Sequence, residues 1–212
     1  HAGERGIKVT CEMGGKNPAV VMADADLNLA LAGVMKGAFG STGQRCTATS
    51  RLILDEKIAD RFLKMVLAEV RKITLGDGLV KGIGMGPAVD ESQMKTDLDY
   101  IEIAKKEGAK LLCGGKRPAD KDLEHGYFVE PTIFDGVTPK MRLWREEVFG
   151  PVLAVTRAKD FEEALGLAND CVFGLTCAIY TQDLTQAMRF ADAAEVGMVH
   201  VNSPTIGGEA QV

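Results

Sequence analysis

The sequence predicts an α/β fold of three layers, in which helices cover both faces of a mainly parallel sheet. Three observations predict it. Short apolar segments alternate with longer segments of helical periodicity along the whole chain. The segment Pro18–Met22 has no charge and is rich in Ala and Val, which is typical of a strand buried on both faces. Finally, 212 residues suit one domain, or one domain with an appendage.

The elements of the first half follow in order. Ile7–Cys11 is an apolar-rich strand candidate, and Pro18–Met22 is the first buried strand. Asp24 or Asp26 can cap a helix over Leu27–Phe39, which is apolar nearly all round and is therefore expected to be buried on several sides. Gly40–Cys46 has the composition of a loop, and Arg51–Leu54 is expected to be the next strand.

Helices and strands alternate through the rest of the chain, beginning with two amphipathic helices. The first helix runs from about Ile58 to Ile73, where Gly76-Asp77-Gly78 ends it, and the second runs from Asp90 to Gly108. Asp160 with Glu163 forms a capping box, and Asp183 can cap the last helix. The remaining strands are expected at Ala109–Cys113, Phe128–Phe134, Pro151–Val155, Thr176–Tyr180 and Met198–Asn202.

Composition excludes several classes of protein. A net charge of −5 gives no basic surface for nucleic acid. The sequence has no run of about 20 apolar residues for a membrane span, and we expect no signal peptide because no basic segment precedes an apolar one. Five cysteines without a C-x-x-C pair indicate neither a disulfide framework nor a metal site. We therefore expect a cytoplasmic protein whose partners are small molecules or other copies of itself.

Cys46 is the first candidate for chemistry. A cysteine attacks as its thiolate, which must be stabilised and accessible. Cys46 follows a Gly-rich segment and stands beside Arg45, a setting that favours the thiolate. The other four cysteines lie in or next to apolar segments, where a cysteine is commonly inert packing. These features alone leave open whether Cys46 is a nucleophile or an ordinary loop residue.

Glu12 is the second candidate. It lies between the apolar segment Ile7–Cys11 and the pair Gly14-Gly15, which allows a close approach of the backbone. A carboxylate in a cleft has its pKa raised by desolvation, which suits a general base. A single glutamate in a loop is more often a solvated charge, so this residue too is undecided on its own.

Five ordered motifs resemble those of the aldehyde dehydrogenase family. The segment CEMGGKNP (residues 11–18) resembles the family's E-L-G-G-K-(N/S)-P, and GQRCTA (residues 43–48) resembles its nucleophile signature. Glu12 and Cys46 are 34 positions apart, as in the family. The later motifs are EEVFGP (residues 146–151), N-x-x-x-F-G-L (residues 169–175) and V-N-S-P-T (residues 201–205). The resemblance covers essentially the whole chain.

The resemblance implies a fold, a reaction and a set of site residues. Cys46 would attack the aldehyde, hydride would leave for NAD or NADP, and water activated by Glu12 would hydrolyse the thioester. The backbone N–H of Cys46 would form half of an oxyanion hole. Glu147, Phe149 and, through its backbone, Met13 would contact the nicotinamide end of the cofactor. Glu146, Lys16 and Arg45 are expected to be structural.

The resemblance also implies missing parts. Family members are about twice as long, and their amino-terminal half binds the cofactor. We therefore expect residues 1–212 to be a catalytic domain truncated at both ends, inactive alone and part of a homo-oligomer, a dimer or a tetramer. Residues 203–210 resemble semialdehyde dehydrogenases that act on 2-oxoglutarate semialdehyde. Two alternatives stay open, a CoA-acylating aldehyde dehydrogenase and an inactive structural or interaction domain of the same fold.

Overall fold

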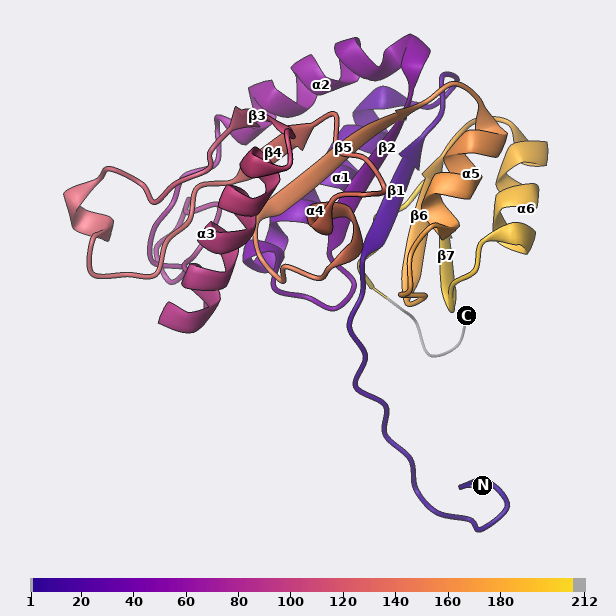
Figure 1. The fold of residues 1–212 in the computed structure, drawn as a ribbon, viewed down its shortest axis with the longest axis horizontal. Coiled ribbons are helices and arrows are strands. Elements are labelled where there is room, and N and C mark those ends of the chain that lie inside the picture. Colours follow the sequence, from indigo (N-terminus) through magenta and orange to yellow (C-terminus); the bar gives the residue numbers. More distant parts are fainter. Residues whose placement is uncertain (1, 208–212) are drawn as a thin grey trace.

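The structure is a computed structural model and describes residues 2–207. Its centre is a seven-stranded sheet with the strand order β3-β4-β5-β2-β1-β6-β7 (Figure 1). Every neighbouring pair is parallel except β3 and β4, which are antiparallel. The strands are β1 (Asn17–Val21), β2 (Thr49–Asp55), β3 (Lys110–Cys113), β4 (Thr132–Asp135), β5 (Val152–Ala158), β6 (Thr176–Tyr180) and β7 (Met198–Val201).

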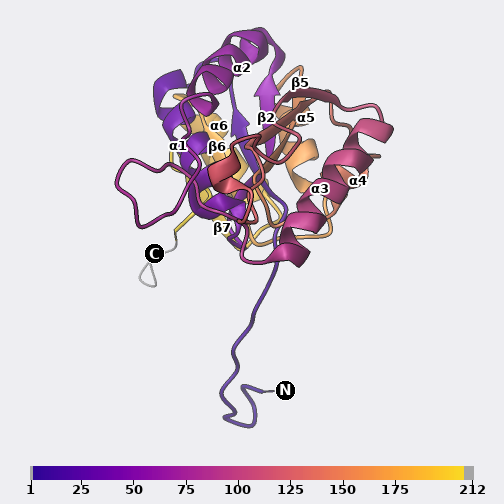
Figure 2. The same cartoon turned by 90° about the vertical axis from the view of Figure 1, so that its left-hand side faces the viewer.

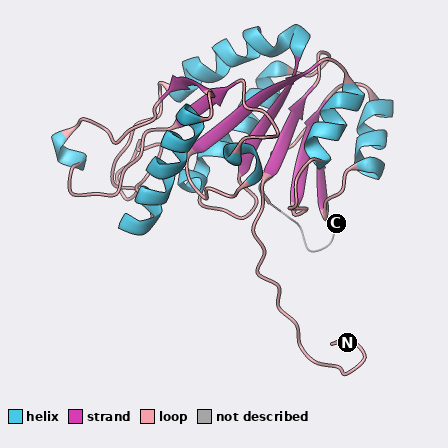
Figure 3. Ribbon diagram, in the orientation of Figure 1, coloured by secondary structure: helices cyan, strands magenta, loops and turns pink. Residues whose placement is uncertain are grey.

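Helices cover both faces of this sheet (Figure 3). The helices α1 (Leu27–Phe39) and α2 (Glu56–Val70) pack on one face. The helices α3 (Glu91–Lys106), α4 (Arg142–Arg145), α5 (Phe161–Asn169) and α6 (Leu184–Ala193) pack on the other. Alternate side chains of β1 divide between two apolar cores, with Val20 facing α3–α6 and Val21 facing α1 and α2. The predicted three-layer, mainly parallel α/β fold is confirmed.

Aspartate caps fix where several helices begin. Asp26, rather than Asp24, caps α1, because its carboxylate accepts the backbone N–H of Asn28 at 2.9 Å and of Leu29 at 3.1 Å. Glu163 N–H donates to Asp160 at 2.9 Å, and the Glu163 carboxylate accepts Lys159 N–H at 2.8 Å, so the predicted capping box is present at α5. Asp90 and Asp183 likewise cap α3 and α6.

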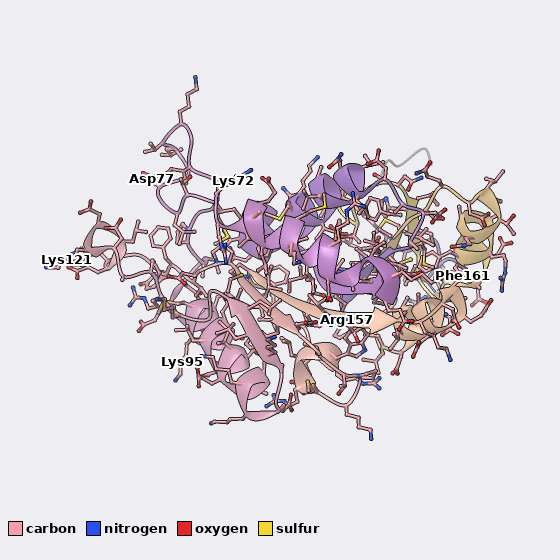
Figure 4. The ribbon with its side chains drawn as sticks, turned by 90° about the horizontal axis from the view of Figure 1, so that it is seen from above. Lys72, Asp77, Lys95, Lys121, Arg157 and Phe161 are labelled. Atoms are coloured by element: carbon pink, nitrogen blue, oxygen red, sulfur yellow. The ribbon has the colours of Figure 1, made fainter. Side chains whose placement is uncertain are left out.

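Ion pairs join β5 to β4 and to α2. Arg157 of β5, which is labelled in Figure 4, donates to Asp135 of β4 at 2.6 Å and to Asp60 of α2 at 3.0 Å. Arg157 therefore links β5 to both β4 and α2.

No helix among residues 2–207 is long and apolar enough to cross a membrane.

Some predicted boundaries were wrong. Ile7–Cys11 is not a strand: this segment extends away from the body without a strand partner, and Ile7 and Val9 are exposed (Figure 2). The helix α2 ends at Val70, not near Ile73, because the chain then turns so that Leu75 can bridge to Met85. Strand β4 starts only at Thr132, because Glu130 bonds to Lys116 outside the sheet. The short α4 was not predicted.

Candidate active site

The candidate site residues lie at the amino ends of three adjacent parallel strands. Residues 12–16 lead into β1, residues 43–48 into β2, and residues 146–151 into β5. Because β5, β2 and β1 are neighbours and run in the same direction, their amino ends meet at one edge of the sheet. Figure 1 shows the amino-terminal segment entering the molecule at this edge. The fold therefore brings together three motifs that are far apart in sequence.

Hydrogen bonds join these three segments directly. The Gly15 N–H donates to the Glu147 carboxylate at 2.8 Å. The Asn17 side-chain amide donates to the carbonyl oxygens of Cys46 and Ala48, each at 2.8 Å. A shallow hollow lies between the segments, and its lining includes Gly15, Gly43, Arg45, Glu147 and Phe149. The backbone that presents Cys46 and the carboxylate of Glu147 are thus both held by the segment that follows Glu12.

Two glycines allow this close assembly. A Cβ on Gly15 would lie 2.5 Å from the carbonyl oxygen of Cys46. Gly43 adopts a φ of +67°, and a Cβ there would lie 2.2 Å from the carbonyl oxygen of Gly150. Both distances are too short for any side chain. Gly15 and Gly43 are therefore required because the backbones of neighbouring loops pass too close for a side chain at either position.

Backbone strain is concentrated at the same place. Ser41, Thr42 and Phe149 have φ values of 52°, 59° and 62°, the left-handed region that residues other than glycine rarely adopt. Ser41 and Thr42 precede Cys46, and Phe149 follows Glu147. Arg45 donates to the Ser41 hydroxyl at 2.9 Å and so shapes this loop, as expected from the sequence. Strain of this kind persists where a site needs an unusual backbone, which agrees with a functional role for both loops.

Cys46 and Glu12 are both exposed at this edge. Within residues 2–207 neither side chain has a hydrogen bond or ion pair, so the structure places the two in neighbouring segments without joining them. Two other cysteines differ from Cys46 in burial and therefore in the pKa of their thiols. Burial raises the pKa of Cys177 to about 12 and that of Cys113 to about 11, which keeps both thiols protonated at neutral pH. Cys46 is thus an accessible thiol, as is Cys11 on the amino-terminal segment.

Glu146 and Glu147 are adjacent but have opposite environments. Glu146 binds Arg142 through two hydrogen bonds of 2.8 and 2.7 Å and accepts the Tyr100 hydroxyl at 2.6 Å. These partners lower the pKa of Glu146 to about 2, so this residue is a structural anion as expected. Glu147 uses one oxygen for Gly15 N–H and lines the hollow. The Phe149 ring is 39% exposed and Met13 is 59% exposed, so both are accessible to a ligand.

A pair of buried cations lies beneath the site. Lys16 is buried, its amine has no hydrogen-bond partner within the described residues, and burial, followed by the charge of Arg51, lowers its pKa to about 7. Arg51 donates to the carbonyl oxygens of Lys16 at 2.7 Å, Leu167 at 3.0 Å and Ala168 at 2.8 Å, and lies over the Trp144 ring. The sequence did not single out Arg51, although an arginine inside an apolar strand signals such a role.

The segment that resembles semialdehyde dehydrogenases also reaches the Cys46 loop. The buried Thr205 hydroxyl donates to the Thr47 carbonyl oxygen at 2.7 Å and shares a hydrogen bond with the Thr49 hydroxyl at 2.8 Å. Residues 203–207 are therefore fastened one residue away from Cys46. The rest of that sequence match, Gly208–Ala210, lies outside the described residues.

A larger hollow lies at the opposite edge, at the carboxyl ends of the strands. Its lining includes four aspartates: Asp24, Asp55, Asp160 and Asp183. Ligands in open α/β sheets commonly bind at this edge. Here each carboxylate is already engaged: Asp55, Asp160 and Asp183 cap helices, and Asp24 accepts the Thr181 hydroxyl and the N–H groups of residues 182 and 183. The acidic lining is structural, and the candidate site stays at the amino ends.

The whole chain, residues 1–212, matches the aldehyde dehydrogenase family. It is 45% identical over 207 residues to an alpha-ketoglutaric semialdehyde dehydrogenase of Bacillus subtilis and 47% identical over 204 residues to a 2,5-dioxopentanoate dehydrogenase of Saccharolobus solfataricus. These alignments cover 98% and 96% of this chain but only 42% of each relative.

Solved structures show the same fold. Betaine aldehyde dehydrogenase from Staphylococcus aureus in complex with NAD+ superposes on 100% of this chain with a TM-score of 0.94 and 36% identity, and the match covers 42% of that protein. This chain therefore belongs to the aldehyde dehydrogenase family. It spans about two fifths of the length of the curated relatives it matches.

Proposed function

We propose that this chain is the catalytic part of a longer aldehyde dehydrogenase, which oxidises an aldehyde to a carboxylic acid with NAD or NADP. The observation that carries this proposal is the set of hydrogen bonds that joins three motif segments around one hollow. Two of these segments carry the exposed Cys46 thiol and the exposed Glu12 carboxylate. The family match over the whole chain supports it. In this proposal residues 1–212 are one catalytic domain, and a separate cofactor-binding domain belongs to the complete protein.

The residues of this chain divide the reaction between them. The Cys46 thiolate forms a bond to the aldehyde carbon and gives a thiohemiacetal, whose oxygen accepts the Cys46 N–H. Loss of hydride from that carbon converts the adduct to a thioester. Glu12 then takes a proton from water, the resulting hydroxide attacks the thioester carbon, and Cys46 leaves as thiolate. The Asn17 amide, bonded to the Cys46 carbonyl, keeps the nucleophile loop in place during both steps.

The residues present fit a nicotinamide cofactor. Glu147 faces the hollow with a carboxylate that can accept hydrogen bonds from ribose hydroxyls, and the exposed Phe149 ring offers a surface for packing. Met13 stands at the entrance segment, where its backbone would contact the carboxamide. When bound, the nicotinamide accepts the hydride released from the thiohemiacetal. The solved relative from Staphylococcus aureus binds NAD+, which supports this role.

We further propose a semialdehyde substrate that carries a carboxylate, of the 2-oxoglutarate semialdehyde type. Three relatives at 45–47% identity are named for this activity, in Bacillus subtilis, Saccharolobus solfataricus and Haloferax volcanii. The hydrogen bond from Thr205 to Thr47 supports it, because the segment that resembles those enzymes is fastened beside the nucleophile. A cytoplasmic location and a homo-oligomeric state, a dimer or a tetramer, complete the proposal.

Two alternatives predict different outcomes. A CoA-acylating enzyme resolves the thioester with a thiol and has no need of a hydrolytic base, so the presence of Glu12 favours hydrolysis. An inactive structural domain would tolerate loss of the nucleophile or base, and both residues are present and exposed. The hydrolytic dehydrogenase therefore accounts for more of the site than either alternative.

The first test is an assay of the complete protein with a panel of aldehydes, NAD and NADP. We expect a carboxylic acid to form without CoA, and the best substrate to be a semialdehyde with a carboxylate. Formation of acyl-CoA only, in the presence of CoA, would identify the acylating alternative. No reduction of either cofactor with any aldehyde would contradict the proposed function.

The second test uses the 212-residue chain alone. We expect it to leave NAD unreduced with a good substrate of the complete protein, because the site in this chain lacks the residues of a cofactor domain. Iodoacetamide should still alkylate Cys46 in the chain, whereas the buried thiol of Cys177 should stay unmodified, as mass spectrometry would show. Reduction of NAD by the chain at the rate of the complete protein would contradict this expectation.

A further inference from the structure

Helix α3 holds the 146–151 loop through one polar stripe. Gln93, Asp97 and Tyr100 occupy positions i, i+4 and i+7 and therefore share a face of the helix. The Gln93 amide donates to the Val148 carbonyl oxygen at 2.9 Å, and the Tyr100 hydroxyl donates to Glu146 at 2.6 Å. The stripe thus forms hydrogen bonds to the residues on both sides of Glu147, Glu146 and Val148.

Asp97 is the centre of this stripe. Its side chain is fully buried, one oxygen accepts the Gln93 amide at 2.8 Å, and the other has no partner within the described residues. A Cβ on Gly150 would lie 2.0 Å from the Asp97 carboxylate, so the carboxyl group packs against the bare backbone of the loop. The two amide hydrogens of Gln93 are both engaged, one on Asp97 and one on Val148, which fixes the orientation of the amide.

Among residues 2–207, no cation forms an ion pair with Asp97. Charged groups on the elements around it already have partners: Asp90 caps α3, Arg142 pairs with Glu146, Arg145 pairs with Asp170, and Glu147 accepts Gly15 N–H. Burial raises the pKa of Asp97 to about 7, and the bond from Gln93 opposes this rise only in part. The Asp97 carboxyl group therefore titrates near neutral pH while it is buried between α3 and the 146–151 loop.

We propose that Asp97 is a positioning residue for the 146–151 loop, which it holds through Gln93 and against Gly150, and that proton uptake by its carboxyl group stabilises the closed loop. This proposal rests on the cofactor role proposed for Glu147 and Phe149. The loop that carries these two residues would then be fastened most firmly when Asp97 is neutral. No charged side chain of the site itself is needed for this effect.

The sign of the pH dependence follows from proton binding. Opening of the loop exposes Asp97 to water and returns its pKa towards the ordinary value of about 3.9. Between about pH 4 and about pH 7 the closed state binds a proton that the open state lacks, so the free energy of opening falls as pH rises. Above about pH 7 both states are ionised, and the free energy of opening is level.

Amide hydrogen exchange of residues 147–150 and of Val152 in the 212-residue chain tests this proposal, since Pro151 has no N–H. After correction for intrinsic exchange, we expect opening of this segment to become at least about tenfold more frequent between pH 5 and pH 7 and then to level off. The isosteric Asp97→Asn variant should show no such rise. Asp99→Asn is the matched control, because Asp99 is exposed two positions along the same helix, and it should behave like the wild type.

A second measurement on the complete protein links the loop to the cofactor. Asp97→Ala removes the acceptor for Gln93, so we expect KM for NAD to rise about fivefold with a smaller change in kcat, and Asp99→Ala to change neither. The same pH response in Asp97→Asn as in the wild type, or an unchanged KM in a folded Asp97→Ala, would overturn the positioning role. Failure of the wild-type protein to bind NAD would instead contradict the proposed function, while hydrogen exchange would still decide the role of Asp97.

Discussion

Replacement of Cys46 by alanine in the complete protein should abolish aldehyde oxidation, with kcat falling by a factor of about 10⁴ or more. The thiolate forms the covalent adduct from which hydride leaves, and no other described thiol lies in the three segments around the hollow. The effect should fall on kcat while cofactor binding, measured by fluorescence titration, stays within about twofold. Cys11→Ala is the matched control, because Cys11 is an exposed thiol on the adjacent segment, and it should retain activity.

Glu12→Gln should separate the two halves of the same reaction. Gln cannot accept the proton of the hydrolytic water, so thioester hydrolysis should slow by a factor of about 10² to 10⁴. A rapid-mixing experiment should then show a burst of NADH equal to the number of sites, followed by slow turnover. A full steady rate in Cys46→Ala, or the absence of a burst together with normal turnover in Glu12→Gln, would remove these residues from the proposed roles.

Periodicity predicted the fold because the longer helices have a strong local signal, which the four-residue α4 lacks. Leu27–Phe39 was assigned with the observed bounds, since an aspartate cap opens it and a glycine follows it. Ile7–Cys11 failed because alternating apolar residues make a strand only where a neighbouring strand offers hydrogen bonds, and this segment has none in the structure. Sequence spacing cannot indicate whether such a neighbour exists. The antiparallel pairing of β3 with β4 could not be predicted either, because sequence spacing does not indicate which strands pair.

The candidate site was only partly predictable. Motifs placed Cys46, Glu12 and Glu147 in three loops, and the parallel sheet brings together the amino ends of the strands that follow those loops. The roles of Asn17, Arg51 and Asp97 in holding the loops were not predicted, because the hydrogen-bond partners of an amide or a charge depend on the folded structure. Their roles depend on contacts between residues 29 to 117 positions apart, which no local pattern encodes.

The close packing of the site also predicts a large effect on stability, at Gly43. Gly43→Ala should lower the free energy of unfolding of the chain by about 3 kcal/mol, as measured by urea titration. Two costs combine: a φ of +67° is unfavourable for alanine, and the new methyl group would stand 2.2 Å from the carbonyl oxygen of Gly150. The backbone of Gly150 also packs against the buried Asp97 carboxylate, which limits how far it can shift.

Gly40→Ala is the control for this change, since it lies three residues earlier in the same loop. Gly40 has a φ of −59°, and a Cβ there would meet no atom within 4 Å, so its free energy of unfolding should change by less than about 0.5 kcal/mol. In the complete protein Gly43→Ala should also raise KM for NAD, because the methyl group pushes the Cys46 loop away from the loop of Glu147. Equal free energies of unfolding of the two variants would mean that the Cys46 loop and the 146–151 loop can separate without a loss of stability. The contact between Gly43 and Gly150 would then have no part in holding these two loops together.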